Sequence, residues 1–190
     1  MRLIMFAEGT DLRVKQGVLP YAVRFNYTEP HITNFLKRAP AVPFNGKDIT
    51  AQGAYQIVKG TWEMCVKALG LKDFSPSSQD SAALYLIKLR GAENDVLNGN
   101  WIEAIKKCSR EWASLPFQND TSYYNYNGKE YHIFGGTPQP AKKLSTLLEF
   151  LKADHLLPTK DNSIISANWL IPLGIVAALN YKTIKNAISF

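Results

Sequence analysis

Cysteine and histidine are scarce in this chain, and their scarcity excludes several kinds of site. Its 190 residues include only two cysteines, Cys65 and Cys108, and three histidines, His31, His132 and His155. The five residues show neither a CxxC pair nor a Cys/His ligand spacing, so neither a metal site nor a Ser/His nucleophile system is expected. Each cysteine lies among apolar residues in a helical pattern, which predicts two buried, reduced thiols rather than a disulfide.

Two further signals are lacking, a phosphate-binding glycine loop and a secretory leader. Without a glycine-rich loop or a ligand cluster, we expect no cofactor. The basic residue Arg2 is followed by an apolar run shorter than the roughly 7–15 residues of a secretory signal. The sequence therefore predicts synthesis in the cytoplasm without ordinary export.

The composition is that of a folded protein with a modest basic excess. Apolar residues make up 46% of the chain and aromatic residues 12%, enough for a packed core. The formal net charge of +6 suits an anionic partner such as nucleic acid, anionic lipid or a bacterial envelope polymer. Many soluble domains are equally basic without using the charge, and here the basic residues are dispersed rather than clustered. Nucleic acid is therefore not expected as a partner.

Apolar spacing predicts four helices, at 52–69, 76–91, 101–113 and 140–152. The second has the clearest start, because Ser75 is a good N-cap and Pro76 suits the first helical position. Gly70 and Gly91 follow the first two helices and are natural C-terminal stops.

Two regions are predicted to be non-helical. Residues 18–49 combine short β-prone pieces, such as Tyr21–Phe25, with prolines and an Asn45-Gly46 turn, which indicates a small lobe of strands and turns. Residues 118–139 are rich in Asn, Tyr and Gly, which indicates a long loop or a hairpin. Long ordered loops in compact domains are often binding elements.

The end of the chain differs in composition. No charged residue occurs from 162 to 181, a stretch about as long as the roughly 20 residues of a membrane-spanning helix. A buried C-terminal helix is the alternative, but Pro172 and Gly174 are better tolerated in a membrane helix than in a soluble one. We therefore expect a domain at 1–154 and an apolar tail at 155–190 that associates with anionic membranes.

One long run carries a resemblance to a known family. The stretch 69–116, LGLKDFSPSSQDSAALYLIKLRGAENDVLNGNWIEAIKKCSREWASLP, resembles the phage lambda endolysin family, and Glu8-Gly9-Thr10 matches the "EGT" motif expected upstream. The resemblance implies an α+β, lysozyme-like fold, mainly helical with a small β-hairpin lobe. It also implies a monomer that acts on the glycan strands of peptidoglycan at the periplasmic cell wall of the host.

Glu8 is the predicted catalytic residue. Cleavage of a glycosidic bond requires a carboxylic acid that stays protonated near neutral pH. Glu8 follows an apolar segment, 3–7, whose burial would raise the pKa of the glutamate. Gly9 allows a sharp turn after the acid, and Thr10 can cap or hydrogen-bond locally. In isolation the motif is weak, because a surface glutamate ending a helix looks the same, so the resemblance decides for Glu8.

A second group of residues is predicted to contact the substrate. Gly53-Ala54-Tyr55-Gln56 resembles the G-x-x-Q element of lysozyme-like lytic transglycosylases. Glycine leaves space for a sugar, and a glutamine amide offers both a donor and an acceptor to it. Tyr55 is either a stacking platform or core. The predicted substrate-binding residues are Gly53, Tyr55, Gln56, Thr10 and Tyr21.

The choice of mechanism depends on a second carboxylate, and none is marked. Gly17 stands where another phage lysozyme family has its aspartate, and Glu29 and Asp48 carry no signal. Asp11 is too close to Glu8 in the sequence to lie across a sugar ring from it unless the chain turns sharply. The resemblance implies a lytic transglycosylase that needs only Glu8 and leaves a 1,6-anhydromuramic acid. Two alternatives stay open, a muramidase with a second carboxylate and a non-enzymatic envelope- or membrane-binding protein.

The remaining aromatic residues have simpler interpretations. Trp62, Trp101 and Trp112 occur at helical spacings and are expected in the core. The tyrosines of the 118–139 region either stack on glycan or order the loop. They are Tyr123, Tyr124, Tyr126 and Tyr131.

Overall fold

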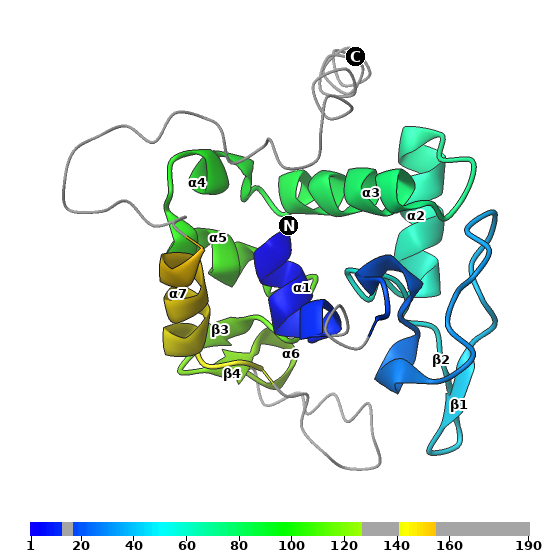
Figure 1. The fold of residues 1–190 in the computed structure, drawn as a ribbon. Helices are drawn as coiled ribbons and strands as arrows, with labels where there is room; N and C mark the ends of the chain where they lie inside the picture. The colour runs from blue at the N-terminus through cyan, green and yellow to red at the C-terminus, as the bar shows by residue number, and fades with distance from the viewer. Residues whose placement is uncertain (13–16, 127–140, 155–190) are drawn as a thin grey trace. The chain divides into compact units, whose positions relative to one another are not determined.

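The computed structural model describes residues 1–12, 17–126 and 141–154 (Figure 1). The chain divides into two compact units, Met1–Phe150 and Leu151–Phe190. The predicted division into a domain at 1–154 and a tail at 155–190 stays a prediction, because the tail lies outside the described residues. Within the described ranges, no helix is both long and apolar enough to cross a membrane.

Helix α3 (Pro76–Leu89) packs one face into the core of the first unit. Its side chains Ala82, Ala83 and Leu86 are fully buried in the core. The start of α3 confirms the predicted cap, since the Ser75 hydroxyl accepts a hydrogen bond from the backbone N–H of Ser78. The end of the helix, close to Gly91, is also as the sequence predicts.

The predicted helix over 52–69 is wrong in its first part. Helix α2 spans only Lys59–Leu69. Residues 52–57 form a loop closed by isolated antiparallel bridges of Gln52 with Arg24 and Ile57. Gly53 has a φ of 80° and Gln56 a φ of 46°, and these left-handed conformations interrupt a right-handed helix. Apolar spacing alone does not reveal such an interruption.

The other helices are shorter than predicted or absent from the prediction. Helix α5 (Trp101–Cys108) gives way to turns before residue 113, and α4 (Glu93–Leu97) is not among the predicted helices. Helix α7 spans Leu144–Ala153, and Pro140, the expected start of that helix, lies outside the described residues.

The small lobe contains the predicted hairpin. Strands β1 (Val42–Phe44) and β2 (Lys47–Ile49) are antiparallel, with Val42 opposite Ile49 and Phe44 opposite Lys47. Asn45 and Gly46 both have positive φ, as a tight two-residue hairpin turn requires.

The expected strand at Tyr21–Phe25 is not formed. The segment instead carries two short 3₁₀ helices, η2 (Pro20–Ala22) and η3 (Phe25–Tyr27). Proline presets the turn of η2, and the backbone N–H of Val23 closes it on the carbonyl of Pro20. Local turn chemistry therefore overrides the β propensity of the segment.

A second hairpin lies in the 118–139 region as far as it is described. Strand β3 (Pro116–Gln118) pairs with β4 (Thr121–Ser122), and α6 (Tyr123–Tyr126) follows directly. A hairpin is therefore present where this region begins, but it ends at Ser122, and Tyr131 lies outside the described residues. Tyr123 packs edge to face against both Phe117 and Tyr124, an arrangement that orders this corner of the unit.

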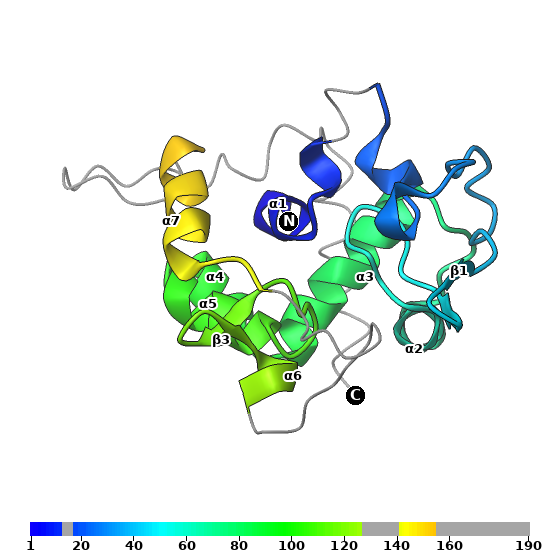
Figure 2. The ribbon, with the colours of Figure 1, turned by 90° about the horizontal axis from the view of Figure 1, so that it is seen from below.

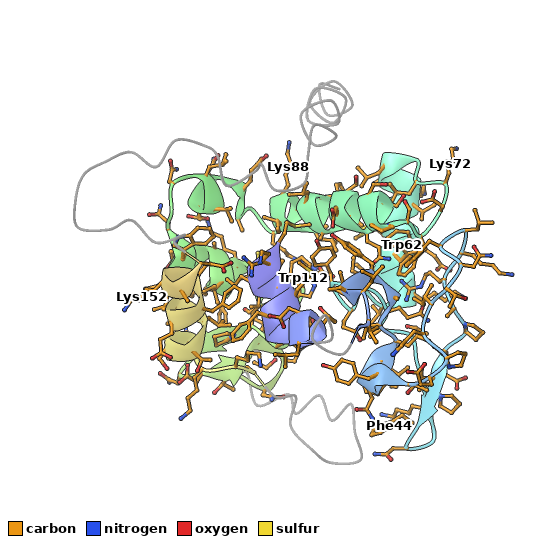
Figure 3. All side chains as sticks on the ribbon, viewed as in Figure 1. Phe44, Trp62, Lys72, Lys88, Trp112 and Lys152 are labelled. Atoms are coloured by element: carbon orange, nitrogen blue, oxygen red, sulfur yellow. The ribbon has the colours of Figure 1, made fainter. Side chains whose placement is uncertain are left out.

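The cysteines and two of the tryptophans lie in the core, as predicted. Cys65 and Cys108 are buried, free thiols. Trp62 and Trp112 are buried, whereas Trp101 is partly exposed. Figure 3 shows side chains filling the space around Trp62 and Trp112 in the first unit.

Candidate active site

Glu8 is the last residue of helix α1 (Arg2–Glu8), which packs into the core through Leu3, Ile4 and Ala7. Seen end-on in Figure 2, α1 lies between α7 and α3. Gly9 ends the helix in the left-handed conformation, with a φ of 76°. The buried helix and its abrupt stop together fix where the glutamate side chain emerges.

The carboxyl group of Glu8 is hydrogen-bonded to a serine from a distant part of the sequence. Ser114 Oγ donates a hydrogen bond of 2.6 Å to Glu8 Oε1. Burial raises the pKa of Glu8 to about 7, while the Ser114 hydrogen bond and the positive charge of Lys142 oppose the rise. Glu8 is therefore divided between its acid and its carboxylate form near neutral pH, as a general acid and base requires.

Three segments that are far apart in the sequence meet at this point. Thr10 Oγ1 donates to the carbonyl of Ala54 over 2.7 Å. The indole N–H of Trp112 donates to the carbonyl of Tyr55 over 2.9 Å. With the bond from Ser114 to Glu8, each of the segments 8–10, 54–55 and 112–114 is tied to the other two. Three hydrogen bonds thus hold together the segments that meet beside the acid.

Gly53 makes this arrangement sterically possible. A Cβ atom at position 53 would lie 2.1 Å from Gln79 Oε1 and 3.1 Å from a ring carbon of Phe74. Gln79 is buried, and its Oε1 accepts the backbone N–H of Ala54 while its Nε2 donates to the carbonyls of Phe74 and Tyr21. The predicted glycine is therefore required by close packing as well as by its positive φ.

The two predicted tyrosines share a hydrogen-bond acceptor on α3. Their hydroxyls both donate to Asp80 Oδ1, over 2.6 Å for Tyr55 and 3.0 Å for Tyr21. Tyr55 is only 1% exposed, and Tyr21 is partly exposed. Burial and the neighbouring Asp80 raise the pKa of Tyr21 to about 12, so it remains neutral. Of the two alternatives for Tyr55, the structure favours core.

Gln56 is the partly exposed member of the predicted set in the 53–56 loop. Its Nε2 donates to the carbonyl of Gly53 over 2.9 Å. This bond holds the amide across the loop that carries it. The predicted residues thus form one connected group, in which Thr10 bonds to the loop and Tyr21 shares Asp80 with Tyr55.

Thr10 is fully buried and is expected to act through the fold rather than through substrate contact. Thr10→Val keeps the shape of the side chain but leaves the carbonyl of Ala54 without its donor. We expect a loss of about 1–3 kcal/mol in the free energy of unfolding, with little change in KM. Chemical denaturation and steady-state kinetics measure the two quantities. Thr33→Val, at an exposed threonine, is the matched control, and a raised KM without a loss of stability would contradict the structural role.

Ser114 and Lys142 are two residues of the site that the sequence does not predict. Ser114 lies within the 69–116 run that carries the family resemblance, but its contact with Glu8 is visible only in the structure. The one sequence feature that could have indicated it is Trp112, a tryptophan two residues earlier that the structure buries. Lys142 carries no signal in the sequence.

The candidate second carboxylates differ in their surroundings. Asp11 lies in the 3₁₀ turn that follows Gly9; burial raises its pKa, while backbone hydrogen bonds and then the charge of Lys142 lower it. The charge of Lys142 also lowers the pKa of Glu8. Glu29 is exposed and lies 2.7 Å from His31 Nε2, and Asp48 is exposed on β2. Of these three, Asp11 shares the electrostatic environment of Glu8.

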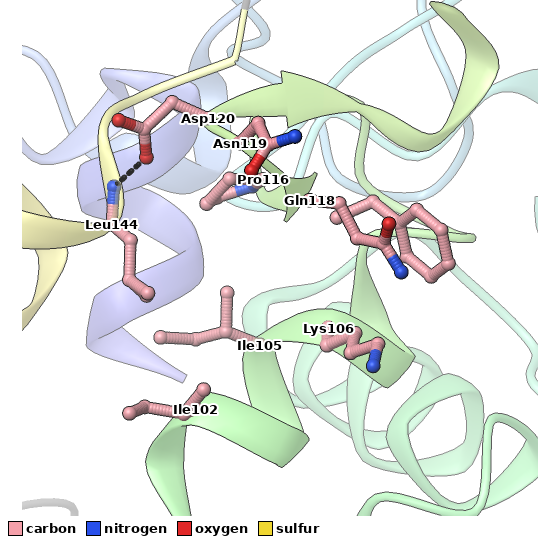
Figure 4. A pocket seen from close by; sticks show the side chains of 9 residues that line it. Ile102, Ile105, Lys106, Pro116, Gln118, Asn119, Asp120 and Leu144 are labelled. Carbon is pink, nitrogen blue, oxygen red and sulfur yellow. Dashed lines mark hydrogen bonds between the residues drawn. The ribbon is translucent and has the colours of Figure 1, made fainter. Parts of the chain in front are cut away.

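A separate cavity of about 210 Å³ lies between α5, the β3–β4 turn and the start of α7 (Figure 4). Both apolar and polar side chains line it. Its lining residues are Ile102, Ile105, Lys106, Pro116, Phe117, Gln118, Asn119, Asp120 and Leu144. Neither Glu8 nor any predicted substrate-binding residue lines it. In the part of the chain that the structure describes, no three Asp, Glu, His or Cys side chains gather to hold a metal ion.

Most of the chain matches a known protein family. The endolysin family profile matches residues 1–137. The chain belongs to the endolysin family. This match covers both the Glu8 segment and the loop 53–56, as well as the run in which the resemblance is strongest.

Two curated endolysins are similar to part of the chain. The endolysin of Escherichia phage lambda is 51% identical over 67 residues, which cover 35% of this chain and 42% of that protein. The endolysin of Escherichia phage P2 is 45% identical over 84 residues, which cover 43% of this chain and 51% of that protein. The chain thus spans about half the length, or less, of the curated endolysins it matches.

Solved structures of lambda lysozyme share the fold of this endolysin-family chain. The bacteriophage lambda lysozyme complexed with a chitohexasaccharide has a TM-score of 0.64 at 29% identity, over 83% of this chain and 92% of that one. Another structure of lysozyme from bacteriophage lambda has a TM-score of 0.53 at 35% identity, over 60% and 75% of the two chains. The predicted lysozyme-like fold, mainly helical with small two-stranded sheets, is confirmed.

Proposed function

We propose that this endolysin-family protein degrades bacterial peptidoglycan at the cell wall of a phage host, with Glu8 as its catalytic acid. The observation that carries the proposal is the partly buried Glu8 carboxyl, with a pKa raised to about 7 and Oε1 held by Ser114. The structurally similar lambda lysozyme was solved with a chitohexasaccharide, which is a β-1,4-linked glycan. A glycan strand is therefore the class of substrate that we assign to this site.

The reaction that we assign is that of a lytic transglycosylase. Protonated Glu8 donates its proton to the glycosidic oxygen between MurNAc and GlcNAc as that bond breaks. The resulting Glu8 carboxylate then takes the proton of the muramic acid C6 hydroxyl, whose oxygen closes onto C1. This yields a 1,6-anhydromuramic acid and restores the acid form of Glu8. A pKa near neutrality supports both halves of the cycle, because each requires a different form of the same group.

Substrate contact is assigned to Gln56 and Tyr21, the partly exposed members of the predicted set. Gln56 offers an amide to sugar hydroxyls or an N-acetyl group. Gly53, by lacking a side chain, lets the 53–56 loop pack closely against Gln79. Thr10 and Tyr55 support the loop from beneath, through the bonds to Ala54 and Asp80.

The mass of the released muropeptides tests the assigned reaction. Wild-type protein acting on purified peptidoglycan should give muropeptides that end in 1,6-anhydromuramic acid, measured by mass spectrometry. Products heavier by one water would show hydrolysis, and would point to a muramidase in which a second carboxylate such as Asp11 takes part. Digestion with a known muramidase gives the reference masses.

Membrane association of the 155–190 tail stays a prediction, since that segment lies outside the described residues. A non-enzymatic envelope-binding protein would leave purified peptidoglycan undigested. The same digestion experiment therefore separates the proposed enzyme from its non-enzymatic rival.

A further inference from the structure

Ser114 holds one particular oxygen of the proposed acid. Its hydroxyl donates to Glu8 Oε1 over 2.6 Å, within the range of a strong, charge-assisted hydrogen bond. Because Oε1 accepts this proton, the acid proton of Glu8 is directed to the other oxygen, Oε2. By fixing which carboxyl oxygen of Glu8 carries the acid proton, the Ser114 hydroxyl also fixes the direction in which Glu8 can donate that proton.

Ser114 is itself fixed by the backbone on both sides. Its carbonyl oxygen accepts the backbone N–H of Lys142 over 2.8 Å. On the other side, Leu115 is buried and its backbone N–H donates to the carbonyl of Trp112, whose indole N–H is bonded to Tyr55. The serine hydroxyl is therefore presented to Glu8 by a rigid segment.

Lys142 adds a positive charge beside the same helix end. Its Nζ lies 5.2 Å from the centre of the Phe6 ring, two residues before Glu8 on α1. Phe6 stacks on Phe150 with ring centres 4.3 Å apart, which packs α7 against α1. Through the Phe6 contact the lysine ammonium is held close enough to Glu8 for its charge to favour the carboxylate.

We propose that Ser114 and Lys142 are positioning residues for Glu8: the serine hydroxyl holds Oε1 and sets the direction of the acid proton, and the lysine charge tunes how readily that proton leaves. The proposal deepens the assigned function and rests on it. Neither residue is assigned a contact with the reacting atoms, since both act through the Glu8 carboxyl.

The charged and polar groups around Glu8 define the expected direction of change. Ser114 and Lys142 both favour the carboxylate, so loss of either should raise the pKa of Glu8 above its value of about 7. Asp11 lies three residues after Glu8, and the positive charges of Lys142 and Arg2 both lower its pKa. Tyr27 also lies at this helix end, where its hydroxyl donates to the carbonyl of Gly9.

For an enzyme whose acid must be protonated, kcat/KM falls as the pH rises through the pKa of that acid. In Ser114→Ala this basic limb should move upward by about one pH unit, and kcat should fall about tenfold or more with KM little changed. Ser114→Thr keeps a hydroxyl and should return both values toward wild type. Lys142→Met should move the limb upward with a smaller change in kcat, and Lys142→Arg should leave it in place.

Matched controls separate positioning from general damage to the fold. Ser109→Ala removes the hydroxyl of a different serine, which is buried and donates to the carbonyl of Lys106. Lys143→Met removes the charge of the neighbouring lysine. Neither control should move the basic limb, and thermal unfolding of all variants shows whether each remains folded.

The outcomes distinguish this proposal from the function on which it rests. An unchanged basic limb and kcat in Ser114→Ala, with wild type active and Glu8→Gln inactive, would overturn the positioning role alone. An inactive wild type, or an active Glu8→Gln, would contradict the proposed function. In that event a carbon-13 NMR titration of Glu8 in wild type and Ser114→Ala still tests the positioning role. The proposal predicts a higher pKa for Glu8 in the variant.

Discussion

Glu8→Gln should lower the rate of peptidoglycan digestion by about 10²–10⁴-fold. A glutamine amide cannot donate the proton that the leaving oxygen requires, nor can it take the proton of the C6 hydroxyl. The substitution keeps the size of the side chain, and Ser114 can still donate to its amide oxygen. We therefore expect loss of activity in a folded protein, measured by release of soluble muropeptides and by circular dichroism.

Glu63→Gln is the matched control, because Glu63 is an exposed glutamate whose contact with Lys59 is a surface ion pair of 3.8 Å. It should retain the activity of wild type. Digestion by Glu8→Gln at more than about one tenth of the wild-type rate would contradict a role for Glu8 as general acid.

The same variant should be more stable than wild type at high pH. The pKa of Glu8 is raised from 4.5 to about 7 in the folded protein. Its contribution to stability is therefore full below the unfolded value of 4.5 and is lost as the pH rises through about 7. Glutamine does not ionise, so the difference in the free energy of unfolding should grow over this interval, to at most about 3 kcal/mol in favour of the variant.

Gly53→Ala should destabilise the protein more than Thr10→Val does. The new Cβ would need the space of Gln79 Oε1, 2.1 Å away, in a backbone with a φ of 80°. Left-handed strain and overpacking together suggest a loss of about 3 kcal/mol or more in the free energy of unfolding. Displacement of Gln79 would also break its bond to Ala54, so peptidoglycan digestion should fall as well.

Gly70→Ala separates strain from packing, since Gly70 has a φ of 66° but no atom within 4 Å of the place that a Cβ would take. It should cost only the left-handed strain, about 1–2 kcal/mol. Chemical denaturation of the two variants measures the difference. An equal loss in both would show that contact with Gln79 contributes nothing.

Local chemistry explains which elements the sequence could predict. Ser75-Pro76 and Asn45-Gly46 predict a helix start and a hairpin turn from the conformations that these residues themselves favour. The loop 52–57 could not be predicted in this way. Its apolar spacing suits a helix, and its left-handed residues are stabilised by Gln79, a side chain from a helix further along the chain.

Some residues of the candidate site could likewise be predicted from short stretches of sequence, and others could not. Glu8 and the 53–56 loop could be found because short motifs contain them. Ser114 and Lys142 could not, since Ser114 meets Glu8 across 106 residues of sequence and Lys142 meets Ser114 only in the fold. Thr10 and Tyr55 are buried, and their hydroxyls bond to the Ala54 carbonyl and to Asp80, so in the fold they support the loop.

Titration of the Glu8 carboxyl is the most direct test of the central claim, that this chain holds a glutamic acid ready to donate a proton near neutral pH. Carbon-13 NMR of labelled protein, with Glu8→Gln used to assign the resonance, gives its pKa independently of any substrate. The structure predicts a midpoint of about 7. A midpoint near 4.5, the ordinary value for a glutamate, would contradict it.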